Sequence, residues 1–230
     1  MLKAGIICAA DTELAPFLAH IEDVTVSEKA MLRFYEGTID GVAVAAVYSG
    51  VCKVNAAIAA QVLIDQYCVN AMINAGTAGG IDQKAALFDT IISTQAVYHD
   101  VAKEILTEFH PWMETIYFPA DARFLAIAKE IAREKQTVYL GCMATGEKFI
   151  EDHMREAIMQ TYAPLSVDME TASIAHVCYA NRIPFIAIRS ITDTAEHAGL
   201  EHFEKNCQKA SEIAKDVVLT FLQKLNGDIA

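Results

Sequence analysis

The sequence predicts an α/β fold, a single three-layer domain in which a central twisted mixed β-sheet is flanked by helices. Short runs rich in Val, Ile and Ala alternate with longer segments of helical periodicity along the 230 residues. Apolar residues make up 53% of the chain and charged residues 21%, which is enough apolar material for a sizeable core. No linker, repeat or low-complexity stretch divides the chain, so we expect one domain over residues 1–230.

The segments that predict strands are short apolar runs bounded by turn or polar residues. In chain order they are residues 3–9, 31–39, 42–49, 71–76, 89–98, 137–146, 165–169 and 184–192. Asp40-Gly41 separates the second run from the third and favours a two-residue hairpin turn. The glycine-rich residues 74–80, NAGTAGG, end the fourth run. We expect there either a tight turn that lets backbone approach a small ligand or a plain strand-to-helix turn.

The segments that predict helices carry apolar residues at helical spacing. They are residues 12–22, 53–67, 121–135, 151–160, 170–181 and 201–225. Asp11 directly precedes the first of them and is its expected N-cap, with Pro16 in or near the first turn. No run of about 18 apolar residues occurs, so we expect no membrane partner.

Composition and spacing disfavour several functional classes. The net charge of −12 and the lack of a Lys/Arg-rich run argue against nucleic-acid binding. The six cysteines form no CxxC or zinc-ribbon spacing and indicate reduced thiols in a cytoplasmic protein. His197 and His202 are five residues apart and fit no metal-binding helix motif, so we expect no metal and no other cofactor.

Acidic side chains follow three of the predicted strands, where the ligand crevice of an α/β sheet lies. They are Glu13, Glu170 and Asp193. Each one alone also fits a helix cap or a solvated helix start, but three on one rim indicate a site. If the strand near 165–169 continues through residue 170, Asp168 and Glu170 share one side and Met169 takes the other. Asp168 also fits a purely structural role.

These carboxylates come without an obvious nucleophile. There is no GxSxG elbow and no local Cys–His signature. Carboxylates alone suit proton chemistry with a cationic transition state, of which glycoside cleavage is the type case. Phe149 and Ile150 follow a strand and a glycine, and they fit either core packing or an aromatic platform for a flat ring.

Six segments resemble, in chain order, motifs of the 5′-methylthioadenosine/S-adenosylhomocysteine nucleosidases, which belong to the nucleoside phosphorylase fold family. They are GIICAADTE, SGVCKVNAA, NAGTAGG, ATGEKFI, SVDMETASIAHV and IRSITDTAE. The resemblance covers most of the chain, and its most specific elements are VDMETASIAHV and RSITDTAE. It implies a nucleoside phosphorylase-like fold, an N-ribosyl hydrolase that releases adenine from a 5′-thio-substituted nucleoside, and a homodimer.

The resemblance also implies a role for each matching residue. Asp193 would protonate or hydrogen-bond adenine N7, Glu13 would orient and deprotonate the attacking water, and Glu170 would bind the ribose hydroxyls. The other implied substrate contacts are Met169 beside the sugar, Phe149 and the backbone of Ile150 at the purine, Thr77 near the sugar and water, Thr192 next to Asp193, and Val51 and Phe203 near the 5′ substituent.

Water is the expected nucleophile, because relatives that use phosphate need cations to hold it. Residues 8–18 contain no Arg or Lys, and Asn74 stands where phosphorylases of the family commonly carry an arginine. A phosphate dianion would also meet the like charge of Glu13.

Two departures from the family pattern leave the 5′ preference open. Ala10 replaces the usual methionine beside the sugar, and residues 105–119 do not match the stretch that closes the 5′ end from a neighbouring subunit. The preference between 5′-methylthioadenosine, S-adenosylhomocysteine, 5′-deoxyadenosine and futalosine-type nucleosides therefore stays open.

Three alternatives to the whole function also stay open. They are a phosphorolytic purine nucleoside phosphorylase, a futalosine-type nucleosidase, and an inactive nucleoside-binding relative.

Overall fold

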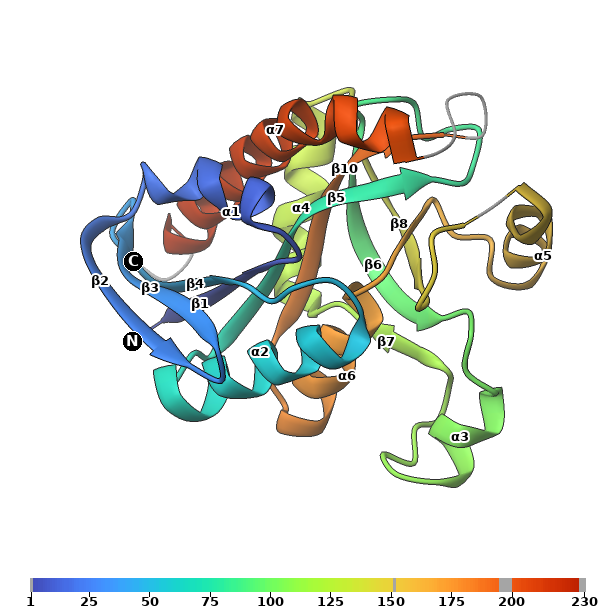
Figure 1. Ribbon diagram of the computed structural model, residues 1–230, viewed down its shortest axis with the longest axis horizontal. Helices are drawn as coiled ribbons and strands as arrows, with labels where there is room; N and C mark the ends of the chain where they lie inside the picture. The colour runs from blue at the N-terminus through green and yellow to red at the C-terminus, as the bar shows by residue number, and fades with distance from the viewer. Residues whose placement is uncertain (1, 151, 195–199, 228–230) are drawn as a thin grey trace.

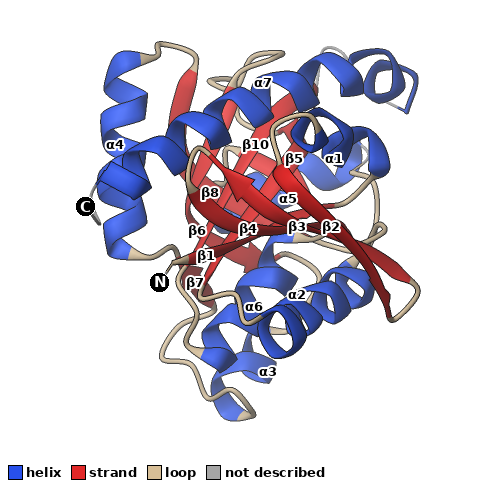
Figure 2. Cartoon of the chain, turned by 90° about the vertical axis from the view of Figure 1, so that its left-hand side faces the viewer, coloured by secondary structure: helices blue, strands red, loops and turns tan. Residues whose placement is uncertain are grey.

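The computed structural model describes residues 2–150, 152–194 and 200–227. The α/β prediction is confirmed, because a mixed β-sheet lies between two layers of helices (Figure 1). One face of the sheet is covered by α1 (Asp11–Leu18), α4 (Ala122–Glu134) and α7 (Leu200–Gly227), and the other by α2 (Lys53–Tyr67) and α6 (Thr171–Asn181) (Figure 2). Two further helices, α3 (Lys103–Glu108) and α5 (Asp152–Tyr162), lie toward the edge formed by β6, β7 and β8.

The described residues form ten strands in one sheet. They are β1 (Lys3–Cys8), β2 (Glu22–Lys29), β3 (Leu32–Ile39), β4 (Val42–Tyr48), β5 (Ala71–Gly80), β6 (Thr90–Tyr98), β7 (Tyr117–Pro119), β8 (Val138–Thr145), β9 (Ser166–Asp168) and β10 (Phe185–Asp193). Their order is β10-β6-β8-β9-β5-β1-β4-β3-β2, with β7 paired to β6. Strand β10 also pairs with β5, so β5, β10, β6, β8 and β9 close into a ring.

The side-chain alternation of the central strands builds both halves of the core. Ile6 of β1 points into the cluster formed with α1, α4 and α7, whereas its neighbour Ile7 points into the cluster formed with α2 and α6. A strand that is buried on both faces reads as a continuous apolar run, which is why the central strands were predictable. None of the helices in the described ranges is both long and apolar enough to cross a membrane.

The predicted hairpin is confirmed. Ile39 pairs with Val42, and the two loop residues between them, Asp40 and Gly41, have φ values of +48° and +78°. The expected N-cap Asp11 is wrong by one residue, because Ala10 occupies the cap position and Asp11 is the first helical residue.

Several elements were not predicted. Strand β2 begins at Glu22, the last residue of the helix expected over 12–22, and no element was predicted for the rest of it. Strand β7 and helix α3 had no predicted counterpart either. The turn expected within NAGTAGG is also wrong, since β5 continues to Gly80 and pairs with β10 up to Gly79. The strand near 165–169 ends at Asp168, so the extended geometry considered through residue 170 does not occur.

Candidate active site

A cavity of about 280 Å³ lies at the carboxyl ends of β5, β9 and β10, against the first turn of α1. This position is where open α/β sheets bind ligands. Its lining includes all ten site residues predicted from the sequence, which are Glu13, Val51, Thr77, Phe149, Ile150, Met169, Glu170, Thr192, Asp193 and Phe203. It also includes residues to which the sequence analysis gave no binding role, among them Lys148, Arg155 and Arg189.

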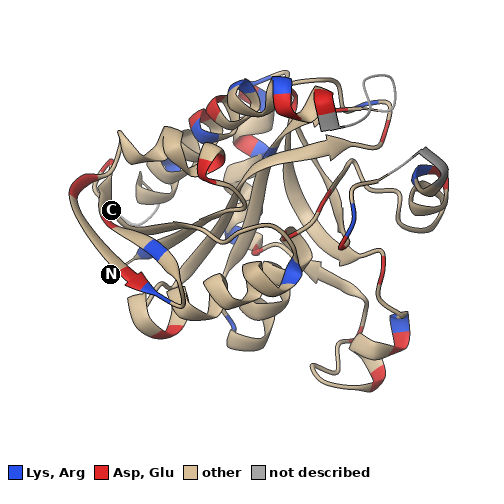
Figure 3. Ribbon diagram, in the orientation of Figure 1, with Lys and Arg blue, Asp and Glu red and all other residues tan. Residues whose placement is uncertain are grey.

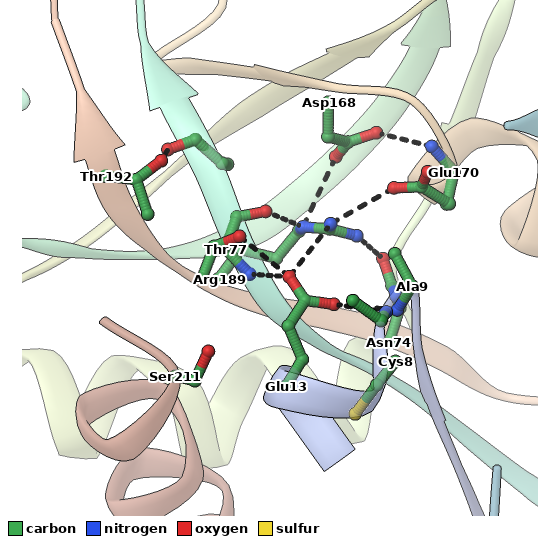
Figure 4. A network of polar contacts seen from close by, with 12 residues as sticks. Cys8, Ala9, Glu13, Asn74, Thr77, Asp168, Glu170, Arg189, Thr192 and Ser211 are labelled. Atoms are coloured by element: carbon green, nitrogen blue, oxygen red, sulfur yellow. Dashed lines mark hydrogen bonds and ion pairs between the residues drawn. The ribbon is translucent and has the colours of Figure 1, made fainter. Parts of the chain in front are cut away.

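Glu13 lies in the first turn of α1, and four hydrogen bonds fix its carboxylate (Figure 4). Oε2 accepts from the N–H groups of Ala9 (2.7 Å) and Ala10 (3.2 Å), and Oε1 accepts from the N–H and the hydroxyl of Thr77, both at 2.7 Å. A Cβ on Gly76 would lie 2.5 Å from this carboxylate, and the φ of Gly76 is +147°. The close approach of Glu13 therefore requires glycine inside the strand.

Arg189, from β10, was missed by the sequence analysis and lies at the centre of the polar network (Figure 4). Its side chain is 2% exposed. Nε donates to the Thr77 carbonyl (2.6 Å), Nη1 to Asn74 Oδ1 (2.9 Å) and Nη2 to Glu170 Oε2 (3.1 Å). It also lies 3.9 Å from Glu13 Oε1 and 3.8 Å from Asp168 Oδ2. We name this group the Arg189 cluster: Glu13, Asn74, Thr77, Asp168, Glu170 and Arg189.

The charges in the Arg189 cluster do not balance, since three carboxylates face one guanidinium. Burial alone lowers the pKa of Arg189, but the carboxylates overcome this effect and raise it. Arg189 therefore stays charged, and the cluster keeps an excess of negative charge. A charged residue inside the apolar run PFIAIRSIT was the available sequence signal, because a buried charge needs a partner.

Asp168 and Glu170 have different environments although they are two residues apart. Asp168 Oδ1 accepts from the Thr145 hydroxyl (2.8 Å) and from the N–H groups of Glu170 (3.0 Å) and Thr171 (2.9 Å), so it caps the start of α6. Glu170 Oε1 accepts from the N–H of Cys52 at 2.9 Å. Burial raises the pKa of Glu170 to about 7, an effect that Arg189 opposes and Asp168 increases.

Asp193 is the last residue of β10, lines the cavity and is 4% exposed. Its Oδ1 accepts from the Thr192 hydroxyl at 2.8 Å. Burial raises the pKa of Asp193, whereas the Thr192 hydrogen bond and the positive charges of Arg155 and His202 oppose that rise. The charged neighbours that affect this carboxyl are therefore cationic, and burial alone accounts for the rise in its pKa.

Two aromatic side chains, Phe149 and Phe203, also line the cavity. Phe149 is 42% exposed and meets Phe203 edge to face, with ring centroids 6.4 Å apart. Ile150 beside it is buried. An exposed ring at the mouth of a pocket is available to stack on a flat ligand, which core packing would not leave it free to do. We name a second group of lining residues the Asp193 wall: Phe149, Ile150, Arg155, Thr192, Asp193 and Phe203.

The residues that the structure describes contain no group of three His, Cys, Asp or Glu side chains placed to hold a metal ion. His197, weighed above as a metal ligand, lies outside the described residues.

The fold and the cavity together define an α/β protein with a carboxylate-lined pocket for a small ligand at the ends of its strands. Residues 3–223 match the Phosphorylase superfamily, and the chain belongs to this family of nucleoside phosphorylases and N-ribosyl hydrolases.

Relatives of known name cover the whole length of the chain. A 5′-methylthioadenosine/S-adenosylhomocysteine nucleosidase of Anoxybacillus flavithermus is 33% identical over 232 residues, which are 98% of this chain and 100% of the relative. One from Colwellia psychrerythraea is 33% identical over 242 residues, which are 99% of this chain and 98% of the relative.

Solved structures also match over almost the whole chain. The nucleosidase of this name from S. pneumoniae, solved with the transition-state inhibitor MT-ImmA, superposes with a TM-score of 0.89 at 30% identity, over 97% of this chain and 100% of that one. A futalosine hydrolase of Helicobacter pylori has a TM-score of 0.88 at 24% identity, over 97% of this chain and 98% of that one, and shows the shared fold alone.

Proposed function

We propose that this protein is an N-ribosyl hydrolase that releases adenine from 5′-thio-substituted adenine nucleosides such as 5′-methylthioadenosine and S-adenosylhomocysteine. The observation that carries the proposal is that Glu13, Glu170 and Asp193 line one cavity of nucleoside size, with Phe149 at its mouth. The full-length similarity to nucleosidases of this specificity supports it.

Asp193 acts as the general acid. It gives its proton to N7 of the purine, and the electron pair of the N-glycosidic bond passes to the base as the bond breaks. A buried carboxyl with a raised pKa keeps its proton closer to neutral pH than an exposed one does. Because pyrimidines have no N7, this acid also selects purines.

Glu13 orients the attacking water and takes its proton as the new C1′–oxygen bond forms. A carboxylate has about four acceptor positions, and four donors already engage Glu13, including the Thr77 hydroxyl. The Thr77 hydroxyl can rotate, whereas the three backbone N–H groups cannot. A water bound between Glu13 and Thr77 would therefore replace the hydroxyl hydrogen bond and keep the other three.

The Arg189 cluster stabilises the charge that develops on the sugar. Cleavage of the bond leaves positive charge on the ribosyl ring, which the excess of carboxylates stabilises in a buried site. Glu170 binds the ribose hydroxyls, and Met169 packs beside the sugar. Arg189 holds Glu170 through Nη2, which orients that carboxylate before substrate arrives.

Water remains the better nucleophile although Arg189 places a cation in the cavity wall. The residues that predicted water as the nucleophile, 8–18 and Asn74, do not include this arginine. However, Arg189 donates to Asn74, Thr77 and Glu170 and lies within 4 Å of two more carboxylates. A phosphate dianion would have to displace those partners and would meet the carboxylates left behind.

The end of the pocket that receives the 5′ substituent is formed by Val51 and Phe203, with Ala10 beside the sugar. We further propose that the protein is cytoplasmic, with which its six free cysteines agree.

We also propose that the protein is a homodimer, in which a second copy would complete the 5′ end of the pocket. Within residues 105–119, Phe109 is 60% exposed and Trp112 is 68% exposed, and both are available for such a contact. Sedimentation or light scattering of the purified chain tests the dimer.

A competition assay among adenine nucleosides that differ only at C5′ tests the function. We expect adenine release, with 5′-methylthioadenosine and S-adenosylhomocysteine used in preference to adenosine. Binding of these nucleosides without any adenine release would contradict the proposal and identify an inactive nucleoside-binding relative. Preference for a bulkier aromatic 5′ group would identify a futalosine-type enzyme.

A further inference from the structure

Arg155, on α5, is a buried cation for which the described side chains provide no ion-pair partner. The residue is 9% exposed. Its Nη1 donates to the Gly80 carbonyl at 2.5 Å, whereas its Nε is buried and has no hydrogen-bond partner. None of the ion pairs between described side chains involves Arg155. A buried charge that is left unpaired is costly, so its position at the cavity calls for a role.

The backbone at the end of β5 brings Arg155 and Asp193 to the same place. Arg155 is bonded to Gly80, and the adjacent Gly79 pairs in register with Asp193. A Cβ on Gly79 would lie 3.1 Å from Asp193 Oδ2, so the carboxyl lies directly over this backbone. The two side chains therefore contact consecutive residues of one strand, and both line the cavity.

We propose that Arg155 is a positioning residue for the acid step, in which its guanidinium stabilises the Asp193 carboxylate that forms when the proton leaves for the purine. This inference rests on the proposed function. The O–H bond of Asp193 breaks, the N7–H bond forms, and a full negative charge stays behind in a buried site. A fixed cation nearby compensates that charge and returns no proton, because guanidinium does not deprotonate in proteins.

Other charged groups face Asp193 and must be separated from Arg155 in any test. His202 of α7 opposes the rise in the pKa of Asp193 as Arg155 does, but it lies on a different helix. Lys148 lines the cavity on the loop before α5. Glu13, Asp168, Glu170 and Arg189 also line the cavity, and Arg189 is already paired with Glu170.

The test compares wild type with two variants that remove the charge, Arg155→Gln and Arg155→Met, and one that keeps it, Arg155→Lys. The Gln variant retains a donor for the Gly80 carbonyl and so protects the fold if the Met variant fails. Arg133→Met, at an exposed position of α4, is the matched control. Two quantities are measured: the pKa of the Asp193 carboxyl by ¹³C NMR, with its signal assigned from Asp193→Asn, and the pH profile of kcat for adenine release from 5′-methylthioadenosine.

Loss of the Arg155 charge should raise the pKa of Asp193 by about one unit and move the basic limb of kcat up by the same amount. The plateau of kcat should fall about threefold, because a weaker acid transfers its proton less readily. The Lys variant and the Arg133→Met control should keep the wild-type profile. An unchanged Asp193 titration in both neutral variants would overturn the inference. If wild type releases no adenine, the proposed function fails, but the NMR titration still decides the role of Arg155.

Discussion

The Arg189 cluster and the Asp193 wall differ in how far the protein itself fixes their side chains. In the Arg189 cluster every member is at most 9% exposed, and Glu13 alone accepts four hydrogen bonds. In the Asp193 wall, Phe149 is 42% exposed. Each group also holds one buried atom without a hydrogen-bond partner among the described residues, Asp168 Oδ2 in the cluster and Arg155 Nε in the wall. The Arg189 cluster is therefore held mainly by its own hydrogen bonds, whereas the Asp193 wall offers an exposed aromatic ring to a ligand.

This difference matches what each side has to do in the proposed reaction. Positive charge develops on the sugar, and charge is stabilised best by groups that need no reorganisation. The base must enter, accept a proton and leave, which favours an open aromatic mouth. The Arg189 cluster should therefore contribute to both stability and activity, and the Asp193 wall mainly to activity. Substitutions in each of the two groups test that division.

Glu13→Gln should cause the largest combined loss. An amide cannot act as the base, so adenine release should fall by about 10²–10⁴. The amide NH₂ also faces two of the four donors that held the carboxylate, which should lower the free energy of unfolding by about 1–3 kcal/mol. Steady-state assays and urea unfolding measure the two effects, with Glu156→Gln on the exposed side of α5 as the control. Full activity would place the water elsewhere.

Asp193→Asn should lose about 10²–10⁴ in turnover while it still binds substrate analogues. Its stability should stay at the wild-type value or rise, since asparagine removes the cost of burying an acid whose pKa is already raised. Calorimetric titration with a non-cleavable nucleoside and thermal unfolding give the two readouts. Near-normal turnover would exclude Asp193 as the proton donor, and a large loss of stability would blur the contrast with Glu13.

Arg189→Met should lower the free energy of unfolding by about 3–5 kcal/mol, because three buried carboxylates then lose their shared cation. Arg133→Met, at an exposed position, should change it by less than about 0.5 kcal/mol. Denaturant unfolding at neutral pH compares the two. A small effect at Arg189 would mean that the cluster is not the rigid half of the site.

Glu170 should make stability depend on pH. Burial raises its pKa to about 7 from the ordinary 4.5, so the folded chain binds this proton more tightly than the unfolded chain does. The contribution of Glu170 to stability is therefore complete below about pH 4.5 and is lost as the pH rises through about 7. Relative to Glu170→Gln, which resembles the protonated form, wild type should lose about 1–3 kcal/mol over this interval. Parallel unfolding curves at all pH values would contradict this.

Local signals explain what the sequence could predict. Apolar runs with period two or 3.6 indicated the central strands and the long helices, and Asp40-Gly41 indicated the hairpin. Strand β2 escaped because its sequence EDVTVSEK lies exposed at the edge of the sheet, so no buried face marks it. The NAGTAGG segment reads locally as a turn, but it is a strand whose glycines admit Glu13 at Gly76 and Asp193 at Gly79.

The site was predictable where a family motif carries a residue. Such motifs place Glu13, Glu170 and Asp193, and all three line the cavity. Arg189 and Arg155 were missed because their roles depend on partners far away in sequence. Arg189 meets Asn74 and Glu170 only after β5, β10 and the start of α6 have come together. Arg155 reaches the Gly80 carbonyl, next to the residue that pairs with Asp193, only after β5 and β10 have paired.

Phosphate dependence tests the central claim that water bound at Glu13 attacks the sugar. Wild type is assayed with 5′-methylthioadenosine in buffer freed of phosphate and again with phosphate added, and the sugar product is followed by ³¹P NMR. We predict equal rates of adenine release in both buffers and no phosphorylated sugar. Release that requires phosphate and yields a sugar 1-phosphate would contradict the account.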